Sequence, residues 1–289
     1  MEYLLHIAIL VSIYAMLGLS LDLIVGYAGL LSITHAAFYG IGAYGTALLM
    51  INQGFGFFTA MLLGMVISGV VALVIGAVLS RFRGDYYALG SFGFNVIIFS
   101  ILLNWQSLTR GPLGIPGIHR PELFGISFSD NVMFLILCII LGAIVYGVCW
   151  YLTRSSFGRV LTAIREDENM VQVFGYATPY FKLVVFVIAA MLAALAGALL
   201  ASYITFIDPS SFSLNESIFI LAIIILGGLA SHEGALAGAF FLIVLPEALR
   251  FLGFPSDVAA QMRQVTYGAI LVLFMLYRPQ GFLGKFRMN

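Results

Sequence analysis

The chain has 289 residues, of which 62% are hydrophobic and only 9% charged, and its formal net charge is +0. Its mean hydropathy of +1.08 excludes an ordinary soluble domain, in which about half of the residues are apolar. The balanced charge gives no global field that would attract nucleic acid. Apolar runs long enough to cross ~30 Å of hydrocarbon recur from end to end, so the sequence predicts an all-α polytopic membrane protein.

Nine apolar runs are expected to form helices in the membrane, separated by turn residues such as glycine, proline and aspartate. In chain order the runs are Tyr3–Val25, Ala36–Ile51, Phe57–Leu79, Tyr86–Trp105, Val132–Leu152, Leu183–Thr205, Glu216–Leu229, Ala235–Leu249 and Val265–Tyr277. The first run is too long for the apolar core of a cleavable signal peptide, and no basic region precedes it. Because several runs are short or rich in glycine, the predicted count is about eight to ten transmembrane helices.

Lysine and arginine divide unevenly between the two sides of the nine-helix arrangement. Nine of these residues fall on one side, and the four on the other are Arg110, Arg120, Arg250 and Arg263. Because cytoplasmic loops carry the excess of positive charge, the N-terminus is expected outside and the C-terminus in the cytoplasm. A ten-helix arrangement with both termini inside is the alternative. Residues 1–289 are expected to form a single transmembrane domain, with an external loop at 106–131 and a cytoplasmic segment at 153–182.

Polar and glycine residues interrupt two apolar stretches, one in each half of the chain. The first is "GYAGLLSITHAAFYGIGAYG" from Gly26, and the second is "ILGGLASHEGALAGAFF". Interrupted helices in both halves are typical of transporters built from inverted repeats around a central site. The alternative is that the glycines only allow helices to pack closely. The residues predicted to line or shape a pathway are Gly29, Ser32, His35 and Asn95, because they place polar or backbone groups at membrane depth.

Three acidic residues lie at the ends of predicted membrane helices. Asp22 and Glu247 each come near the end of a run, where a side chain reaches the membrane surface. Glu216 begins a run, and an acid there favours the positive end of a helix dipole. The alternative is that Asp22 or Glu247 carries protons inside the membrane.

The cytoplasmic segment holds the densest charge of the chain. Its sequence "RVLTAIREDENMVQVFGYA" contains four consecutive charged residues, Arg165 to Glu168. Apolar side chains fall at helical spacing on one side of this segment, with Asp167 placed to cap a second helix and Gly175 placed to end it. We predict two short amphipathic helices that lie along the membrane surface. The alternative is a solvated loop that only connects two membrane helices.

Several catalytic and nucleotide-binding motifs are absent from the sequence. There is no G-x-x-x-x-G-K-[ST] phosphate-binding loop and no H-E-x-x-H, C-x-x-C or G-x-S-x-G motif. The four histidines and the two cysteines, Cys138 and Cys149, form no metal-ligand cluster by spacing. The pattern is typical of a membrane conduit whose energy source lies in another subunit, and not of an enzyme.

Five blocks of sequence resemble the branched-chain amino acid ABC transporter permeases of the LivM/LivH type. They are "LIVGYAGLLSITHAAFYGIGAY", "TRGPLGIPGI", "SSFGRVLTAIREDENMVQVFGY", "ILGGLASHEGALAGAFFLIVLPEALR" and "YGAILVLFMLYRPQGFLG", in the order of that family and covering Leu23 to Gly284. The "AIREDE" and "RPQGF" blocks are closer to the LivM-like subfamily. One departure is His232–Ala235, where the family commonly has a small apolar or aromatic residue and a proline.

The resemblance implies a type II ABC importer-like transmembrane domain with an inverted-repeat core, in the plasma (inner) membrane of a prokaryote. It implies a second permease subunit as heterodimer partner, two cytoplasmic ABC ATPase subunits and a periplasmic or extracellular substrate-binding protein. ATP is then used by the partners, and this chain holds no cofactor. The family's ATPase-coupling segment matches Ser155–Gly175. Its coupling residues here are Gly158, Val160, Ile164, Arg165, Glu166, Asp167, Glu168, Val171 and Gly175.

The implied substrates are leucine, isoleucine and valine. Permeases for urea and short amides share the same motifs, so these substrates are the first alternative. An ion-coupled secondary transporter is a second alternative, and it requires a deeply placed acid such as Asp22 or Glu247. An intramembrane enzyme would need a nucleophile and base or a set of metal ligands, for which the sequence gives no pattern.

Overall fold

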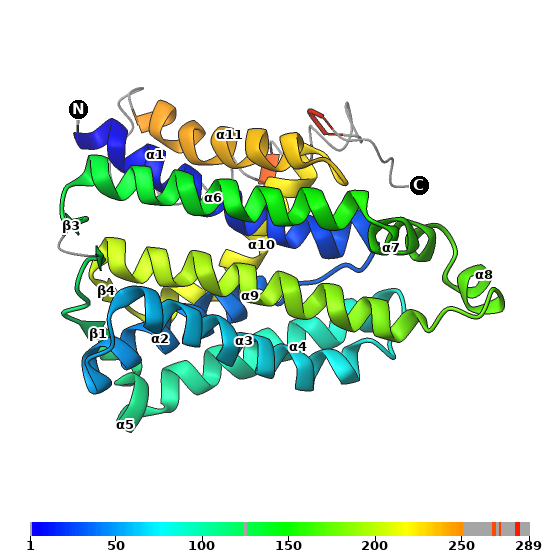
Figure 1. Ribbon diagram of the computed structural model, residues 1–289, viewed down its shortest axis with the longest axis horizontal. Coiled ribbons are helices and arrows are strands. Elements are labelled where there is room, and N and C mark those ends of the chain that lie inside the picture. The colour runs from blue at the N-terminus through cyan, green and yellow to red at the C-terminus, as the bar shows by residue number, and fades with distance from the viewer. Residues whose placement is uncertain (1, 124–125, 251–267, 270–271, 273–280, 284–289) are drawn as a thin grey trace.

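A computed structural model describes residues 2–123, 126–250, 268–269, 272 and 281–283 of the chain. The described residues form a bundle of long helices that run side by side (Figure 1). Two short helices, α7 (Ser156–Glu166) and α8 (Glu168–Val173), lie at one end of the bundle, and the short β-strands lie at the other. We refer to these as the α7–α8 end and the strand end.

Five helices in the described part of the chain are long and apolar enough to cross a membrane on their own. They are α1 (Glu2–Asp22) with its π-helical continuation η1 (Leu23–Tyr27), α3 (Phe57–Leu79), α4 (Asp85–Asn104), α6 (Asn131–Arg154) and α9 (Thr178–Ile204).

Three further helices are α2 (His35–Gln53), α10 (Leu214–Gly227) and α11 (His232–Arg250). A break with a bend of 120° separates α10 from α11, and the pair counts as a sixth crossing if it is one broken span. Eight of the nine predicted runs therefore coincide with helices. The ninth, Val265–Tyr277, lies mostly outside the described residues.

Short elements cluster at the strand end of the bundle. They are α5 (Gln106–Thr109), η2 (Gly111–Leu113), β1 (Ile115–Pro116), β2 (Glu122–Leu123), β3 (Ile126–Ser127), β4 (Phe206–Ile207) and η3 (Pro209–Phe212). Strands β2 and β3 form a hairpin, whereas β1 pairs antiparallel with β4, so that Ile115 lies opposite Ile207. The loop between α4 and α6 is therefore tied to the segment that follows α9.

Helices α2 and α10 both begin inside the bundle. The Ala36 backbone N–H at the start of α2 donates to the Ser217 hydroxyl near the start of α10, at 3.0 Å. Asn95, near the middle of the 20-residue α4, donates to the same hydroxyl. Since α4 is about as long as the hydrocarbon core is thick, both helix N-termini lie near mid-membrane depth.

The two halves of the chain repeat one arrangement. A long helix, α1, is followed by segment 28–34 and then by α2 and α3, and another long helix, α9, is followed by segment 205–213 and then by α10 and α11. Helices α2 and α3 pack on α9, and α10 and α11 pack on α1. This packing of each half on the long helix of the other half agrees with the predicted inverted repeat. The break in the second half, however, is at 205–213 and not at the glycine-rich stretch. The glycine-rich stretch that we paired with the first break forms the tight α10–α11 turn instead.

Glycines at two helix contacts allow backbones to touch. A Cβ atom added at Gly197 of α9 would lie 2.1 Å from the Tyr39 carbonyl oxygen of α2, and one at Gly227 would lie 2.0 Å from the Gly234 carbonyl oxygen. Both distances are much shorter than a van der Waals contact between two atoms, so any larger residue would push the helices apart. Gly227, which lies in the second interrupted stretch, thus serves close packing, as the alternative interpretation proposed, and Gly197 does the same on α9.

Candidate functional site

Three of the four predicted pathway residues meet where α2 and α10 begin. His35 Nε2 lies 3.0 Å from the Ser20 hydroxyl of α1, and the Ser32 and Thr34 hydroxyl oxygens lie 2.9 Å apart. Asn95 Nδ2 donates to the Ile33 carbonyl oxygen at 2.7 Å. We call this cluster, with Ser217, the junction. Ser32, His35 and Asn95 are fully buried in this chain, so they shape the interior and form none of its open surface.

The junction holds polar atoms that the described residues do not satisfy. His35 Nδ1 and Asn95 Oδ1 are buried and have no hydrogen-bond partner among the described side chains and backbone. Buried polar groups in proteins are nearly always paired with protein atoms or ordered water. The junction is therefore a place where a water molecule or a polar solute can bind.

Gly29, the fourth predicted pathway residue, lies at the α7–α8 end, away from the junction. Its φ of +69° is in the left-handed region, and an added Cβ would lie 2.5 Å from Arg165 Cγ. Arg165 Nη1 also donates to the carbonyl oxygen of Gly26 in η1, at 2.6 Å. Segment 28–34 thus runs from a contact with α7 at one end to the junction at the other.

Asp22 does not reach the membrane surface as its position in the sequence led us to expect. The side chain is fully buried, and its Oδ1 accepts a hydrogen bond of 2.9 Å from the Ala230 backbone N–H. Ala230, in the α10–α11 turn, has a positive φ of 57°, and Asp22 therefore ties α1 to that turn. The side chain of Glu247 lies outside the described part of the structure.

Glu216 lies deeper than the sequence indicated. Its carboxylate Oε1 accepts a 2.5 Å hydrogen bond from the Tyr14 hydroxyl, and Tyr14 is halfway along the 26-residue span Glu2–Tyr27. Because α10 has only 14 residues, it is too short to cross the membrane, and its first turn lies inside. The shortness of this run is the signal in the sequence that indicates this depth.

The charged segment after α6 forms two helices, as the sequence predicted. The Ser155 hydroxyl caps α7 by accepting from the Gly158 backbone N–H, and Asp167 caps α8 by accepting from the N–H groups of Asn169 and Met170. Gly175 follows α8 with a φ of +88°, in keeping with its predicted role as terminator.

The apolar face of these helices packs on the chain itself. Leu161 and Ile164 are buried where α7 lies against α6, α9 and η1, and Val171 is buried on α8, which contacts α9 and α7. Ile164 and Val171, which the resemblance places among the coupling residues, are therefore buried within the chain itself. The apolar side chains that are open belong to α8 and its end: Met170, Val173 and Phe174, which are 57%, 82% and 76% exposed.

Glu168 is an internal anchor, although we had placed it among the charges that face a partner. Its carboxylate binds Lys182 Nζ at 2.6 Å and the Thr178 hydroxyl at 2.8 Å, and the Lys182 side chain is only 1% exposed. Arg83, from the loop between α3 and α4, lies 3.6 Å from the same carboxylate. Glu166 is different, because it is 60% exposed and pairs only with its neighbour Arg165 among the described residues.

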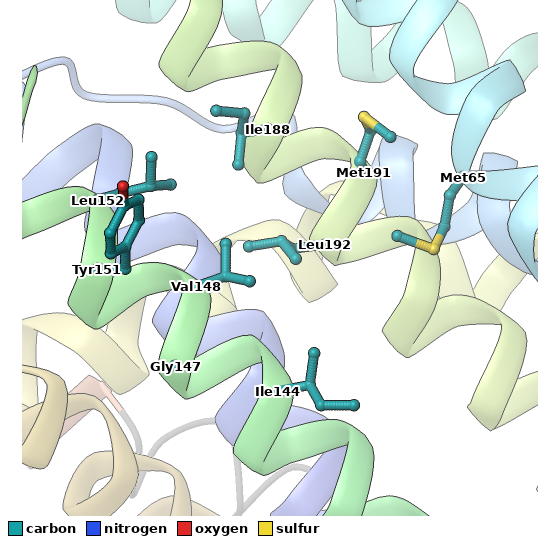
Figure 2. Close-up of a pocket in the computed structure, with 9 residues that line it drawn as sticks. All are labelled: Met65, Ile144, Gly147, Val148, Tyr151, Leu152, Ile188, Met191 and Leu192. Atoms are coloured by element: carbon teal, nitrogen blue, oxygen red, sulfur yellow. The ribbon is translucent and has the colours of Figure 1, made fainter.

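An apolar groove of ≈ 530 Å³ lies between α3, α6 and α9 (Figure 2). Its lining is Met65, Ile144, Gly147, Val148, Tyr151, Leu152, Ile188, Met191 and Leu192. Apart from the Tyr151 hydroxyl, these side chains offer nothing that would orient a polar solute. In a membrane this surface suits lipid acyl chains.

The bundle contains membrane-length helices, two shorter helices that begin at its centre, and amphipathic helices at one end. This arrangement is that of a multi-pass membrane transport protein. The chain belongs to the family of permease components of the branched-chain amino acid transport system, whose model matches residues 3–275.

Individual members of this family align with nearly the whole chain. It is 36% identical to the high-affinity branched-chain amino acid transport system permease proteins LivM of Salmonella typhimurium and Escherichia coli, over 96% of this chain and 69% of theirs. It is 26% identical to the permease protein BraD of Pseudomonas aeruginosa, over 95% of this chain and 92% of that relative. No solved structure matches the chain.

Proposed function

We propose that this chain is a permease subunit of an ATP-binding cassette importer for leucine, isoleucine and valine. The observation that carries the proposal is the family match over residues 3–275, together with 36% identity to two LivM permeases named for branched-chain amino acid transport. The sequence has no phosphate-binding loop, which supports the proposal that separate subunits hydrolyse the ATP.

The assembly that we propose has four kinds of component. A related second permease pairs with this chain, in line with the LivH relatives that also align with it. Two ATPase subunits dock at the α7–α8 end, which is then cytoplasmic with the C-terminus, and a substrate-binding protein docks at the strand end. The complex lies in the inner membrane of a prokaryote, and the partners alone use ATP.

The coupling segment supports this assembly through its two faces. Met170, Val173 and Phe174 form an open apolar surface at the end of the bundle, suited to a groove on an ATPase. On the opposite side, Arg165 holds the Gly26 carbonyl oxygen and contacts Gly29. A displacement of α7 by the ATPase would therefore move segment 28–34, which leads to the junction. Ser32, His35 and Asn95 shape the pathway there.

The experiment that tests the substrate is uptake by the complete complex in liposomes, with binding protein outside and ATP inside. We expect uptake of labelled leucine that unlabelled isoleucine and valine inhibit and that urea and acetamide do not. Uptake of urea or acetamide in preference to leucine would replace the proposed substrate with the amide alternative.

A second candidate function, ion-coupled secondary transport, is favoured by one observation: the Glu216 carboxylate lies at mid-membrane depth. Uptake by this chain alone in liposomes, driven by an imposed proton gradient, distinguishes the two candidates. The ABC proposal predicts no uptake without the ATPases.

A further inference from the structure

Polar residues form a continuous strip on segment 208–216. We define the polar strip as Asp208, Ser210, Ser211, Ser213, Asn215 and Glu216, all of which are half-buried or exposed in this chain. Pro209 and Phe212 between them are buried, as is Ile207 before them, whereas Leu214 is half-buried. The segment thus turns its polar side outward and its apolar side toward the bundle.

The polar strip leads from the strand end to the middle of the membrane. It begins next to β4, which pairs with β1 at the strand end, and it ends beside Ser217, which contacts Asn95 at the middle of α4. Hydroxyl, amide and carboxylate groups cannot face lipid hydrocarbon without a large cost. The strip must therefore face a water-filled pathway or another protein chain.

Glu216 is the deepest charge of the polar strip, and no cation of the described residues pairs with it. Its Oε1 accepts from Tyr14, but no ion pair in the described structure includes Glu216, and its Oε2 has no hydrogen-bond partner there. The N-terminal turn of α10 helps to tolerate the negative charge. It supplies no counter-cation, however, and intramembrane carboxylates usually pair with a cation or mark the route of a substrate.

An unsatisfied acceptor also lies at the junction, beside the residue that follows Glu216. Asn95 Oδ1 is fully buried and unpartnered among the described residues, while Nδ2 of the same amide contacts Ser217, the residue after Glu216. This oxygen is fully buried and is not part of the polar strip, so the Glu216 carboxylate is the acceptor that an ammonium group, with its three donors, would meet there.

We propose that Glu216 binds the α-ammonium group of an amino acid as it passes the centre of the membrane, with the polar strip as the wall of the outer half of the pathway. Tyr14 is the positioning residue, because it holds Oε1 and leaves Oε2 open to the substrate. The inference rests on the proposed function and makes it more specific. A zwitterionic amino acid carries an ammonium group that can pair with the Glu216 carboxylate, whereas a neutral amide has no charge to pair with it.

The test uses the complete complex with its partner permease, ATPases and binding protein, and it measures ATP-driven uptake of labelled leucine. Glu216→Gln keeps the size of the side chain and an oxygen for Tyr14 but removes the charge. We expect uptake to fall by about tenfold or more, the loss typical of one hydrogen bond to a charged group. Glu216→Asp, which keeps the charge, should retain part of the uptake.

Three results would decide against the inference. Wild-type uptake with Glu216→Gln would show that the carboxylate does not bind substrate, while the proposed function stands. Proton-driven uptake by this chain alone that is lost in Glu216→Gln would make Glu216 a proton carrier. If Glu216→Gln fails to assemble, Tyr14→Phe takes its place, and an unchanged KM for leucine would then overturn the inference. Failure of the wild-type complex to import leucine contradicts the proposed function instead.

Discussion

Arg165 shows how one side chain can connect two parts of the molecule. Its guanidinium donates to Gly26 in η1 and to Glu166 on α7, and the side chain is only 11% exposed. Arg159, on the same helix, is exposed and bonds only to groups of its own segment, Arg154 and Ser156, in the described structure. These two arginines of α7 therefore have different roles.

Replacing Arg165 should weaken the link between ATP hydrolysis and uptake. Arg165→Ala removes the donor to Gly26, so a movement of α7 would no longer be transmitted through this contact. We expect less leucine imported per ATP hydrolysed in the reconstituted complex. Arg159→Ala is the matched control and should leave this ratio unchanged. An equal effect of the two variants would show that the contact with Gly26 has no role in coupling.

Gly29 gives a prediction about stability. Gly29→Ala combines a left-handed backbone with a steric clash, because the new Cβ would lie 2.5 Å from Arg165 Cγ. Gly54 has a similar φ of +67° but open space around it, so Gly54→Ala should cost only the ~1–2 kcal/mol of the left-handed conformation. Thermal unfolding in detergent should therefore show a larger decrease in Tm for Gly29→Ala. Equal decreases would mean that Arg165 moves aside freely.

Individual residues were predictable from the sequence where their partners are close in the chain. Asp167 caps α8 through Asn169 and Met170, two and three residues away, and the capping pattern was visible. The partners of Arg165 and Glu216 lie 139 and 202 residues away, at Gly26 and Tyr14. Contacts of this kind follow from the tertiary fold, which local patterns do not specify.

At the scale of elements, α8 depends on one internal ion pair. Glu168→Ala would leave Lys182 charged and only 1% exposed without this partner, a change that typically costs about 3–5 kcal/mol. Glu166→Ala removes an exposed acid from the preceding helix and should cost less than about 1 kcal/mol. Hydrogen exchange of peptides over residues 168–174 should speed up strongly in the first variant only. Unchanged exchange in Glu168→Ala would contradict the anchoring role.

The open end of α8 is the element that we expect to contact an ATPase. Val173→Ser with Phe174→Ser removes exposed apolar surface without disturbing the buried side of the helix. We expect the ATPase subunits to co-purify poorly with this variant, since apolar anchors in a groove carry most of the affinity. Val148→Ser with Tyr151→Ser, on the apolar groove of α6, is the control and should retain the ATPases. Full retention by the α8 variant would remove α8 from the interface.

Helix positions were predictable because apolar runs are the strongest signal in a membrane sequence. The breaks were less visible. Segment 28–34 follows Gly26 and contains Gly29, whereas segment 205–213 contains no glycine. The shape of segment 205–213 depends on pairing with β1 and on Asp208 capping η3. The depth of α2 and α10 is likewise set by their contact at Ser217.

At the scale of the whole molecule, the exchanged halves suggest how a signal crosses the bundle. Helices α2 and α3 rest on α9, and α10 and α11 rest on α1, so that each half is held by the long helix of the other. The α7–α8 end contacts segment 28–34, and the polar strip faces outward from 208–216. Both segments end at the junction. A movement of α7 could therefore alter, through segment 28–34, the access to the junction from the strand end.

The central claim is that this chain is a conduit driven by ATP through partner subunits. The most direct measurement is leucine uptake by the complete complex in ATP-loaded liposomes, with a protonophore present to collapse any proton gradient. Our account predicts that uptake persists with the protonophore and stops when a non-hydrolysable analogue replaces ATP. Uptake that the protonophore abolishes, and that continues without hydrolysable ATP, would contradict it.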